Sequence, residues 1–341
     1  MSNTSEYDRL AHKIRQTPSV ESNGAPDTKT LLHYGILAAS SHNTQPWKVV
    51  IDANSITLRP DFDRRCPVVD PDDAHLFKSL GCAAENIVLA SQAQGYIADV
   101  SMDNDGEKIR IDFKKSKSAG VTSLFAAIPN RQCTKTRYDG TALRADELKQ
   151  LEQTGTSGGV RTILLTSGQE LDTVAQYVSH GNEVQLSDPA FRKELISWIR
   201  FNPNDAIRTG DGLSNRTTGN PSLPKWLAKL LIGFVLTPKK QVKTDAEFIK
   251  SSSAIAVFVA QGNDRQSWVN AGRVYQRVAL HATDLGICHA FINQPLEVST
   301  LRPRFESWLN LQDEKALLMV RLGRAEPAPF SLRRSVDDVM A

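Results

Sequence analysis

The most promising chemistry in the sequence lies in a short basic cluster that contains Arg131, Lys135 and Arg137. Side chains four residues apart on a helical turn can converge on one anion. Arginine offers a planar fork to phosphate oxygens, and lysine offers a point charge. A second basic pair, Arg333 and Arg334, lies near the carboxyl terminus. Such a cluster alone is more often a solvated surface, by roughly three to one, so a phosphate site requires a further polar motif.

The segment Ala39–Trp47 supplies that motif and reads Ala-Ser-Ser-His-Asn-Thr-Gln-Pro-Trp. Six consecutive polar residues follow a predicted helix and precede a predicted strand. A helix-terminating loop with Trp47 as a core anchor would explain Pro46 and Trp47, but it would not explain a continuous set of small donors and acceptors. We therefore interpret this segment as the polar partner of the basic clusters.

Several standard catalytic arrangements are absent from the sequence, among them a Walker loop, a Gly-x-Ser-x-Gly elbow and a His-Glu-x-x-His motif. Hydrolase and nucleotide-kinase functions are therefore disfavoured. His42 and His289 lie in the most interesting segments, but the sequence places neither an acid nor a nucleophile beside them, and we predict a structural role for each. Four scattered cysteines, without zinc-site spacing, are predicted to be reduced thiols.

These motifs resemble those of the FMN-dependent nitroreductases. Ala39–Trp47 is similar to the family signature Pro-Ser-Ser-x-Asn-Ser/Thr-Gln-Pro-Trp, and the residues from Arg131 to Lys135 are similar to its opening Arg-x-Ser-x-Arg/Lys motif. The end of the chain, from Pro329, resembles the closing segment whose arginine helps to hold the FMN phosphate. The resemblance implies the following FMN-binding residues: Arg131, Lys135 and Arg333 at the phosphate, Cys133 at the position of the usual serine, Ser40, Ser41 and Asn43 at the ribityl chain or ring, and Asn293 and Gln294 near the flavin N5 edge.

The order of the motifs resembles one branch of the family, the Acg-like branch, in which one chain mimics the nitroreductase dimer. In ordinary nitroreductases the Arg-x-Ser motif comes first, whereas here Asn43 precedes Arg131. The implied fold is α+β, with two nitroreductase-like lobes, residues 1–120 and 121–341, whose antiparallel sheets are surrounded by helices. The lobes would form a pseudo-dimer with one FMN. Cys133 in place of serine and Ser335 in place of proline would alter the phosphate pocket without abolishing it.

Periodicity predicts the elements that must position these residues. A helix is expected over Asp27–Ala39 and a longer one over Asp73–Gln94. Alternating residues predict hairpins from Trp47 to Leu58 and from Ala98 to Phe113. Two segments that are apolar throughout, Ala254–Ala260 and Ala316–Leu322, are predicted to be central strands.

An internal repeat relates the two halves of the chain. Gly81 and the helix-closing Gly95 recur as Gly272 and Gly286 at a constant offset of 191 residues. An acidic residue precedes each helix at the same offset, and an extended segment follows each closing glycine. Duplication explains this order better than chance does, and the two helices, residues 74–94 and 269–285, are expected near the interface of the lobes.

An insertion over about residues 182–250 interrupts the second half and contains the Gly/Asn/Pro-rich stretch from Gly210 to Pro224. We interpret it as a lid. Its apolar run Trp226–Leu236, with lysines around it, fits either a helix packed over a buried site or a helix lying in a membrane interface. The packed interpretation is favoured by roughly three to one, because the run has one apolar stripe.

Composition indicates an ordinary globular protein: 341 residues, 40% hydrophobic and 23% charged, with 41 basic against 38 acidic residues. The charges are interspersed, so nucleic-acid binding gains little support. The apolar runs fall well short of a membrane span. Met1–Thr17 lacks an apolar signal core and an Arg-rich transit pattern, so a cytoplasmic location is expected.

The resemblance implies an FMN-dependent oxidoreductase in which NADH or NADPH reduces the flavin, and a small electron-poor acceptor, such as a nitro compound, quinone or activated alkene, is then reduced. The same geometry would allow the reverse dehydrogenation. A catalytically silent protein that stores or withholds flavin beneath the lid is the alternative, and a relative that binds no flavin is a third. The sequence leaves open the acceptor and whether the monomeric pseudo-dimer associates further.

Overall fold

The computed structural model describes residues 5–18, 24–118 and 120–341. Its first four-stranded sheet has the order β1-β2-β4-β3 and is antiparallel throughout. The strands are β1 (Trp47–Asp52), β2 (Ser55–Pro60), β3 (Tyr96–Met102) and β4 (Ile109–Lys115). Both predicted hairpins are confirmed. In β4, buried Ile109, Ile111 and Phe113 alternate with more exposed polar residues, which leaves one apolar face for α2 (Thr28–Gly35) and α3 (Ala74–Ala93).

The second four-stranded sheet has the order β5-β8-β10-β9 and is also antiparallel. Its strands are β5 (Val160–Leu165), β8 (Ala254–Ala260), β9 (Cys288–Phe291) and β10 (Lys315–Gly323). The prediction of two central strands is confirmed, because β8 and β10 occupy the middle. Successive residues of β8 belong to different hydrophobic clusters, as Val257 and Phe258 do. Both faces of the strand are therefore buried, which explains why its sequence is apolar throughout.

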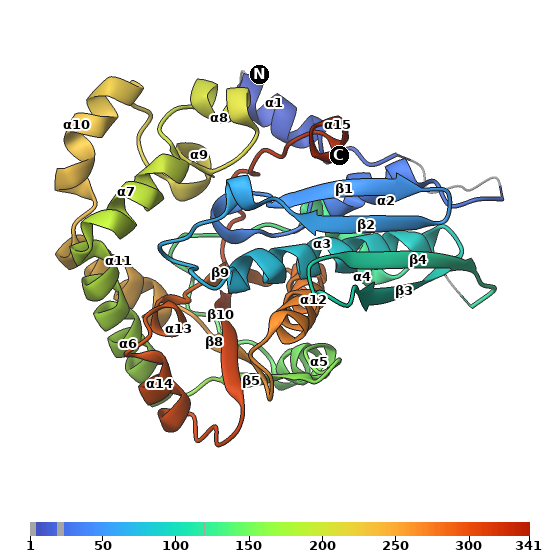
Figure 1. Ribbon diagram of the computed structural model, residues 1–341. Helices are drawn as coiled ribbons and strands as arrows, with labels where there is room; N and C mark the ends of the chain where they lie inside the picture. The colour runs from blue at the N-terminus through green and yellow to red at the C-terminus, as the bar shows by residue number, and fades with distance from the viewer. Residues whose placement is uncertain (1–4, 19–23, 119) are drawn as a thin grey trace.

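Helices α3 and α12 (Arg265–Asp284) pack against each other between the sheets (Figure 1). A Cβ atom on Gly81 would lie 2.1 Å from the Val269 carbonyl oxygen, and one on Gly272 would lie 1.9 Å from that of Lys78. The offset of 191 residues separates Gly81 from Gly272, and it also separates Lys78 from Val269, the residues whose carbonyl groups the glycines approach. The repeated glycines therefore mark a symmetric close crossing. The helix-closing glycines also match, since both have positive φ angles, 87° at Gly95 and 67° at Gly286.

One hydrophobic core runs through this crossing, because a single cluster contains residues of both sheets together with α2, α3 and α12. Shorter helices complete the layers: α1 (Glu6–Lys13), α4 (Ser123–Ala127), α5 (Ala145–Thr154), α13 (Gln294–Glu297), α14 (Arg302–Trp308) and α15 (Val336–Val339). The last of these returns to the first sheet, where the Ala341 N–H donates to the Val49 carbonyl. The architecture is α+β, as predicted. Helix α2 ends at Gly35, four residues before the predicted end, because the chain tightens into a turn in which Ala38 N–H donates to the Gly35 carbonyl.

The insertion is mostly helical and lies along one side of the molecule (Figure 1). It starts within α6 (Gly168–Ser187), whose first half belongs to the core of the second sheet. Its remaining elements are α7 (Pro189–Trp198), β6 (Ile199–Arg200), α8 (Pro203–Thr209), β7 (Leu213–Ser214), α9 (Asn215–Thr218), α10 (Lys225–Val235) and α11 (Pro238–Lys250). The short strands β6 and β7 pair in parallel.

The packed interpretation of the apolar run is wrong for α10. Trp226 is 67% exposed and Leu230 is 66% exposed, whereas the small Ala228 is buried. Figure 1 places α10 at the outer edge of the molecule. Periodicity shows that a helix has an apolar face but not what that face meets. In the described part of the chain, no helix combines the length and hydropathy needed to cross a bilayer.

Candidate functional site

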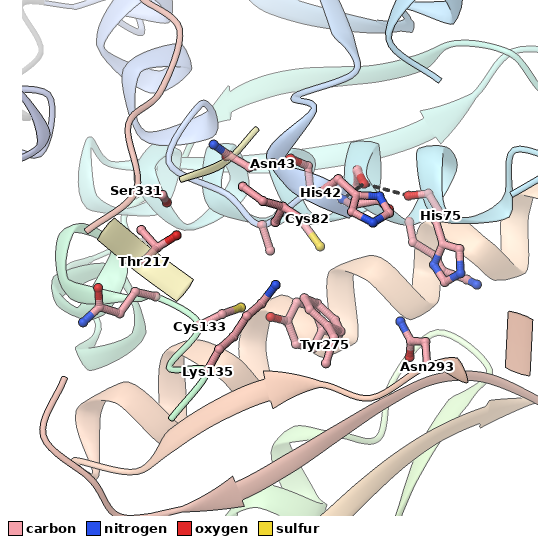
Figure 2. A pocket seen from close by; sticks show the side chains of 18 of the residues that line it. His42, Asn43, His75, Cys82, Cys133, Lys135, Thr217, Tyr275, Asn293 and Ser331 are labelled. Carbon is pink, nitrogen blue, oxygen red and sulfur yellow. Dashed lines mark hydrogen bonds between the residues drawn. The ribbon is translucent and has the colours of Figure 1, made fainter. Parts of the chain in front are cut away.

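A cavity opens where the two halves of the chain meet, with about 1100 Å³ of space including its mouth. The first turns of α3, Tyr275 of α12, the loops around residues 39–43 and 131–135, and the carboxyl-terminal segment all contribute to its walls. Figure 2 shows Asn43, Cys133, Thr217 and Ser331 toward one end and His75 toward the other. Gly212 and Leu213 of the insertion also line the cavity. Elements far apart in sequence therefore build this site, as is usual for a ligand pocket.

Two predicted phosphate ligands, Arg131 and Arg333, are buried in the cavity wall at 2% and 8% exposure. Arg131 donates to the Leu37 carbonyl at 3.2 Å, and Arg333 donates to Asn43 Oδ1 at 2.9 Å. Among the described residues, neither Nε atom has a hydrogen-bond partner. Burial, together with the positive charge of Arg131, lowers the pKa of Arg333 to about 9. Two buried guanidinium groups with donors to spare favour an anionic ligand.

A third arginine, Arg15, was not found by sequence reasoning. It is 6% exposed, donates to the Pro129 carbonyl at 2.7 Å, and stacks over the Phe330 ring with its guanidinium carbon 4.2 Å from the ring centroid. Burial lowers its pKa well below the usual range, and the charges of Arg333 and Arg131 add to this effect. Arg15 lies in the turn that follows α1, without a recognisable motif, so no sequence signal could have placed it near the two arginines. By contrast, Arg137 of the predicted basic cluster is exposed.

The Ala39–Trp47 loop has an unusual backbone: His42, Asn43 and Gln45 have φ angles of 47°, 55° and 53°. Non-glycine residues in this region carry strain that the surroundings must hold. Ser40 Oγ accepts from Gln45 N–H at 3.0 Å, and the Gln45 side chain donates to the Gly210 carbonyl at 2.9 Å. The loop is thus fixed to the insertion.

The three loop residues predicted to bind FMN lie in the cavity wall. Asn43 donates to the carbonyls of Gly212 and Leu332, both at 3.2 Å, and accepts from Arg333. Ser41 N–H donates to Ser79 Oγ at 3.2 Å. The amide of Asn43 is therefore engaged in joining three segments of the chain.

Cys133 and Lys135 both line the cavity, and the structure brings His289 to Cys133. The sulfur lies 3.9 Å from His289 Nδ1, and the Tyr275 hydroxyl lies 3.5 Å from the same atom. Burial opposes ionisation of the thiol, but His289, Arg131 and Lys135 outweigh it and lower the pKa of Cys133 to about 6. The expectation that no nucleophile flanks His289 is wrong.

His42 also has a cysteine neighbour, since Cys66 Sγ lies 3.6 Å from its Nδ1 atom. Burial raises the pKa of the Cys66 thiol, and burial with the Lys135 charge lowers the pKa of His42 to about 4. This pair is therefore neutral near pH 7. All four cysteines are free.

The two residues predicted near the flavin N5 edge have different surroundings. Asn293 lines the cavity, and its Oδ1 accepts from Met319 N–H at 2.8 Å. The Gln294 side chain instead donates to Asn182 Oδ1 at 3.3 Å and to Asp245 Oδ2 at 3.2 Å. It is directed toward α6 and α11 because Gly181 leaves room for it there.

An acid–base cluster that sequence reasoning missed lines the cavity: His75 and Lys78 are buried, and Glu297 is mostly buried. His75 Nε2 lies 3.3 Å from Glu297 Oε1, and Gln185 donates to Glu297 Oε2 at 2.7 Å. Burial raises the pKa of Glu297 to about 7 and lowers that of Lys78 to about 7. The sequence did contain a signal for part of this cluster, because the polar residues His75, Lys78 and Ser79 are spaced to lie on one face of the predicted helix.

Comparison with known proteins gives relatives that span nearly the whole chain. No family model matches it. "Putative NAD(P)H nitroreductase" proteins of Mycobacterium tuberculosis are similar: one is 26% identical over 328 residues, covering 93% of this chain and 91% of the relative. Another, acg, is 23% identical over 321 residues, covering 91% of this chain and 94% of the relative.

Solved structures give weaker matches. A nitroreductase with bound FMN from Bacteroides fragilis has 14% identity and a TM-score of 0.39, covering 63% of this chain and 95% of that one. The FMN-dependent nitroreductase NfnB from Mycobacterium smegmatis, in complex with NADPH, has 12% identity and a TM-score of 0.40, covering 60% and 88%. The sequence relatives therefore carry the assignment.

The comparisons show distant homology to the nitroreductase family: over most of its length the chain is a distant homologue of the "Putative NAD(P)H nitroreductase" proteins of Mycobacterium tuberculosis, acg among them. The family predicted from the sequence motifs is thus confirmed.

Proposed function

We propose that the protein binds one FMN in the cavity and acts as an NAD(P)H-dependent oxidoreductase. The observation that supports this most directly is the pair of buried arginines, Arg131 and Arg333, whose Nε atoms lack partners among the described residues. A phosphate would satisfy both donors and offset the mutual repulsion of the two guanidinium groups. The residues present therefore fit the phosphate end of FMN.

The other assigned residues extend from that end. Lys135 would add a positive charge, and Cys133 occupies the place of the family's serine. Ser40 and Ser41 would face the ribityl chain or ring. Asn43 would lie in the same wall, with its side-chain amide held by Gly212, Leu332 and Arg333. Asn293 would lie at the N5 edge; for Gln294 only the backbone is available, because its side chain is engaged elsewhere. When bound, FMN supplies hydride transfer between NADH or NADPH and an electron-poor acceptor, or the reverse dehydrogenation.

We further propose that residues 1–120 and 121–341 form two nitroreductase-like lobes of a pseudo-dimer. The symmetric crossing of α3 and α12 at Gly81 and Gly272 supports this arrangement. The carboxyl-terminal segment is exchanged onto the first sheet, where α15 packs against α2 and β1. Arg333 would reach the cavity from that exchanged segment.

The first experiment is the visible absorption spectrum of the purified protein before and after anaerobic addition of NADPH. Oxidised-flavin bands that disappear support the oxidoreductase. The double variant Arg131→Ala/Arg333→Ala should weaken FMN binding at least about a hundredfold, since each lost charge-assisted hydrogen bond costs roughly 1.5 kcal/mol or more. Arg137→Ala, from the exposed end of the same cluster, is the matched control. Unchanged FMN retention in the double variant would remove the phosphate assignment.

Flavin storage is a second candidate, because the insertion is fastened to the cavity wall. Gly212 N–H donates to the Asn43 carbonyl at 3.2 Å, and Asp211 pairs with Arg64 of the first half. Within the insertion, Asp211 also pairs with Arg200 at 2.6 Å. Bound flavin that dithionite reduces but NADH and NADPH do not would favour storage. A colourless protein that cannot be reconstituted with FMN would contradict both functions.

A further inference from the structure

Helix α10 turns three large apolar side chains outward. Trp226 and Leu230, four residues apart, are 67% and 66% exposed, and Leu231 is 39% exposed. Among the residues of this helix whose burial the structure describes, Ala228 is buried, and Leu227 and Ile232 are half-buried. A surface helix of a globular protein normally shows the reverse arrangement, with its apolar stripe toward the core. The outward face of α10 is therefore suited to an apolar environment outside the chain.

The sequence on either side of this helix is basic. The stretch from Gly212 to Thr244 contains no aspartate or glutamate and has six basic residues: Arg216, Lys225, Lys229, Lys239, Lys240 and Lys243. Lys225, at the start of α10, and Lys239 and Lys240, just beyond its end, are exposed. Within the described residues, no carboxylate forms an ion pair with these three lysines. Exposed lysines on both sides of an apolar face, with tryptophan on it, are typical of helices that lie in a lipid interface.

We propose that α10 docks the protein on an anionic bilayer surface, with Trp226, Leu230 and Leu231 in the interfacial zone and the flanking lysines at the lipid headgroups. Electrostatic attraction to anionic lipid adds to apolar insertion. A second copy of the chain is disfavoured as the occupant, because two acid-free basic stretches would be brought together. Eleven residues are too few to span the bilayer. This inference does not depend on FMN binding.

Co-sedimentation of the full chain with phosphatidylcholine vesicles, with and without phosphatidylglycerol, tests the proposal. The wild type should bind the anionic vesicles, bind neutral ones weakly, and dissociate at high salt. Trp226→Ala/Leu230→Ala should lose binding at least about tenfold, because it removes apolar area that inserts into the interface. Lys239→Glu/Lys240→Glu should also lose binding at least about tenfold, because it replaces attraction to anionic headgroups by repulsion. Val121→Ser removes an apolar side chain that is 68% exposed outside the insertion, and it should bind as the wild type does.

Several results would overturn the proposal: a wild type that ignores anionic vesicles, equal binding to neutral vesicles, or undiminished binding by Trp226→Ala/Leu230→Ala. Sedimentation velocity without lipid tests the alternative that this face binds a second copy of the chain. A dimer that this double substitution abolishes, in a chain that does not bind vesicles, would assign the face to a second copy. Circular dichroism melts establish that each variant is folded.

Discussion

Gly272→Ala tests the close crossing of α3 and α12. The new Cβ would lie 1.9 Å from the Lys78 carbonyl oxygen and 2.7 Å from its carbon, against an ordinary contact of 3.4 Å or more. Both atoms belong to the backbone, so no side chain can rotate away and the helices must separate. Overpacking of this kind costs about 3 kcal/mol, and the better helix propensity of alanine returns up to about 1 kcal/mol. We expect a net loss of about 2 kcal/mol.

The assay is the free energy of unfolding from denaturant titrations followed by circular dichroism. Gly81→Ala should lose a similar amount, because its Cβ would lie 2.1 Å from the Val269 carbonyl oxygen. Gly168→Ala, at the start of α6, is the matched control: no described atom lies within 4 Å of its Cβ position, and its stability should stay within about 0.5 kcal/mol of the wild type. A Gly272→Ala variant as stable as the Gly168→Ala control would refute the crossing geometry.

Two further predictions concern titratable groups in the cavity wall. The pKa of Cys133 is about 6, whereas burial raises the pKa of Cys66, so iodoacetamide should label Cys133 before Cys66 at pH 7. Bound FMN should slow the labelling of Cys133. Mass spectrometry of the labelled peptides measures both rates, and equal labelling of Cys66 would contradict the prediction. Burial raises the pKa of Glu297 from 4.5 to about 7, so the stability gained from its protonated form is present below pH 4.5 and is lost as the pH rises through about 7. Glu297→Gln should flatten the fall of melting temperature over this range, and an unchanged slope would argue against a buried carboxyl.

Side-chain periodicity accounts for the parts of the fold that were predicted correctly. The hairpins of the first sheet follow from alternation, and the buried strands β8 and β10 follow from runs that are apolar on both faces. Because periodicity and motifs are local, only the site residues that belong to a continuous sequence motif were predicted. Arg131 and the Ala39–Trp47 loop could be read locally, whereas His75, Lys78 and Glu297 come together only when α3 meets α13.

The sequence by itself determined the family, the glycines that close and cross the long helices, and the two arginines of the cavity, because each depends on residue type and local spacing. Only the tertiary structure decided what each face meets. It put Cys133 beside His289, turned Gln294 toward α6, and left the apolar side of α10 in solvent. Contacts between distant segments depend on chain topology, and local patterns carry no information about which partner fills a given face.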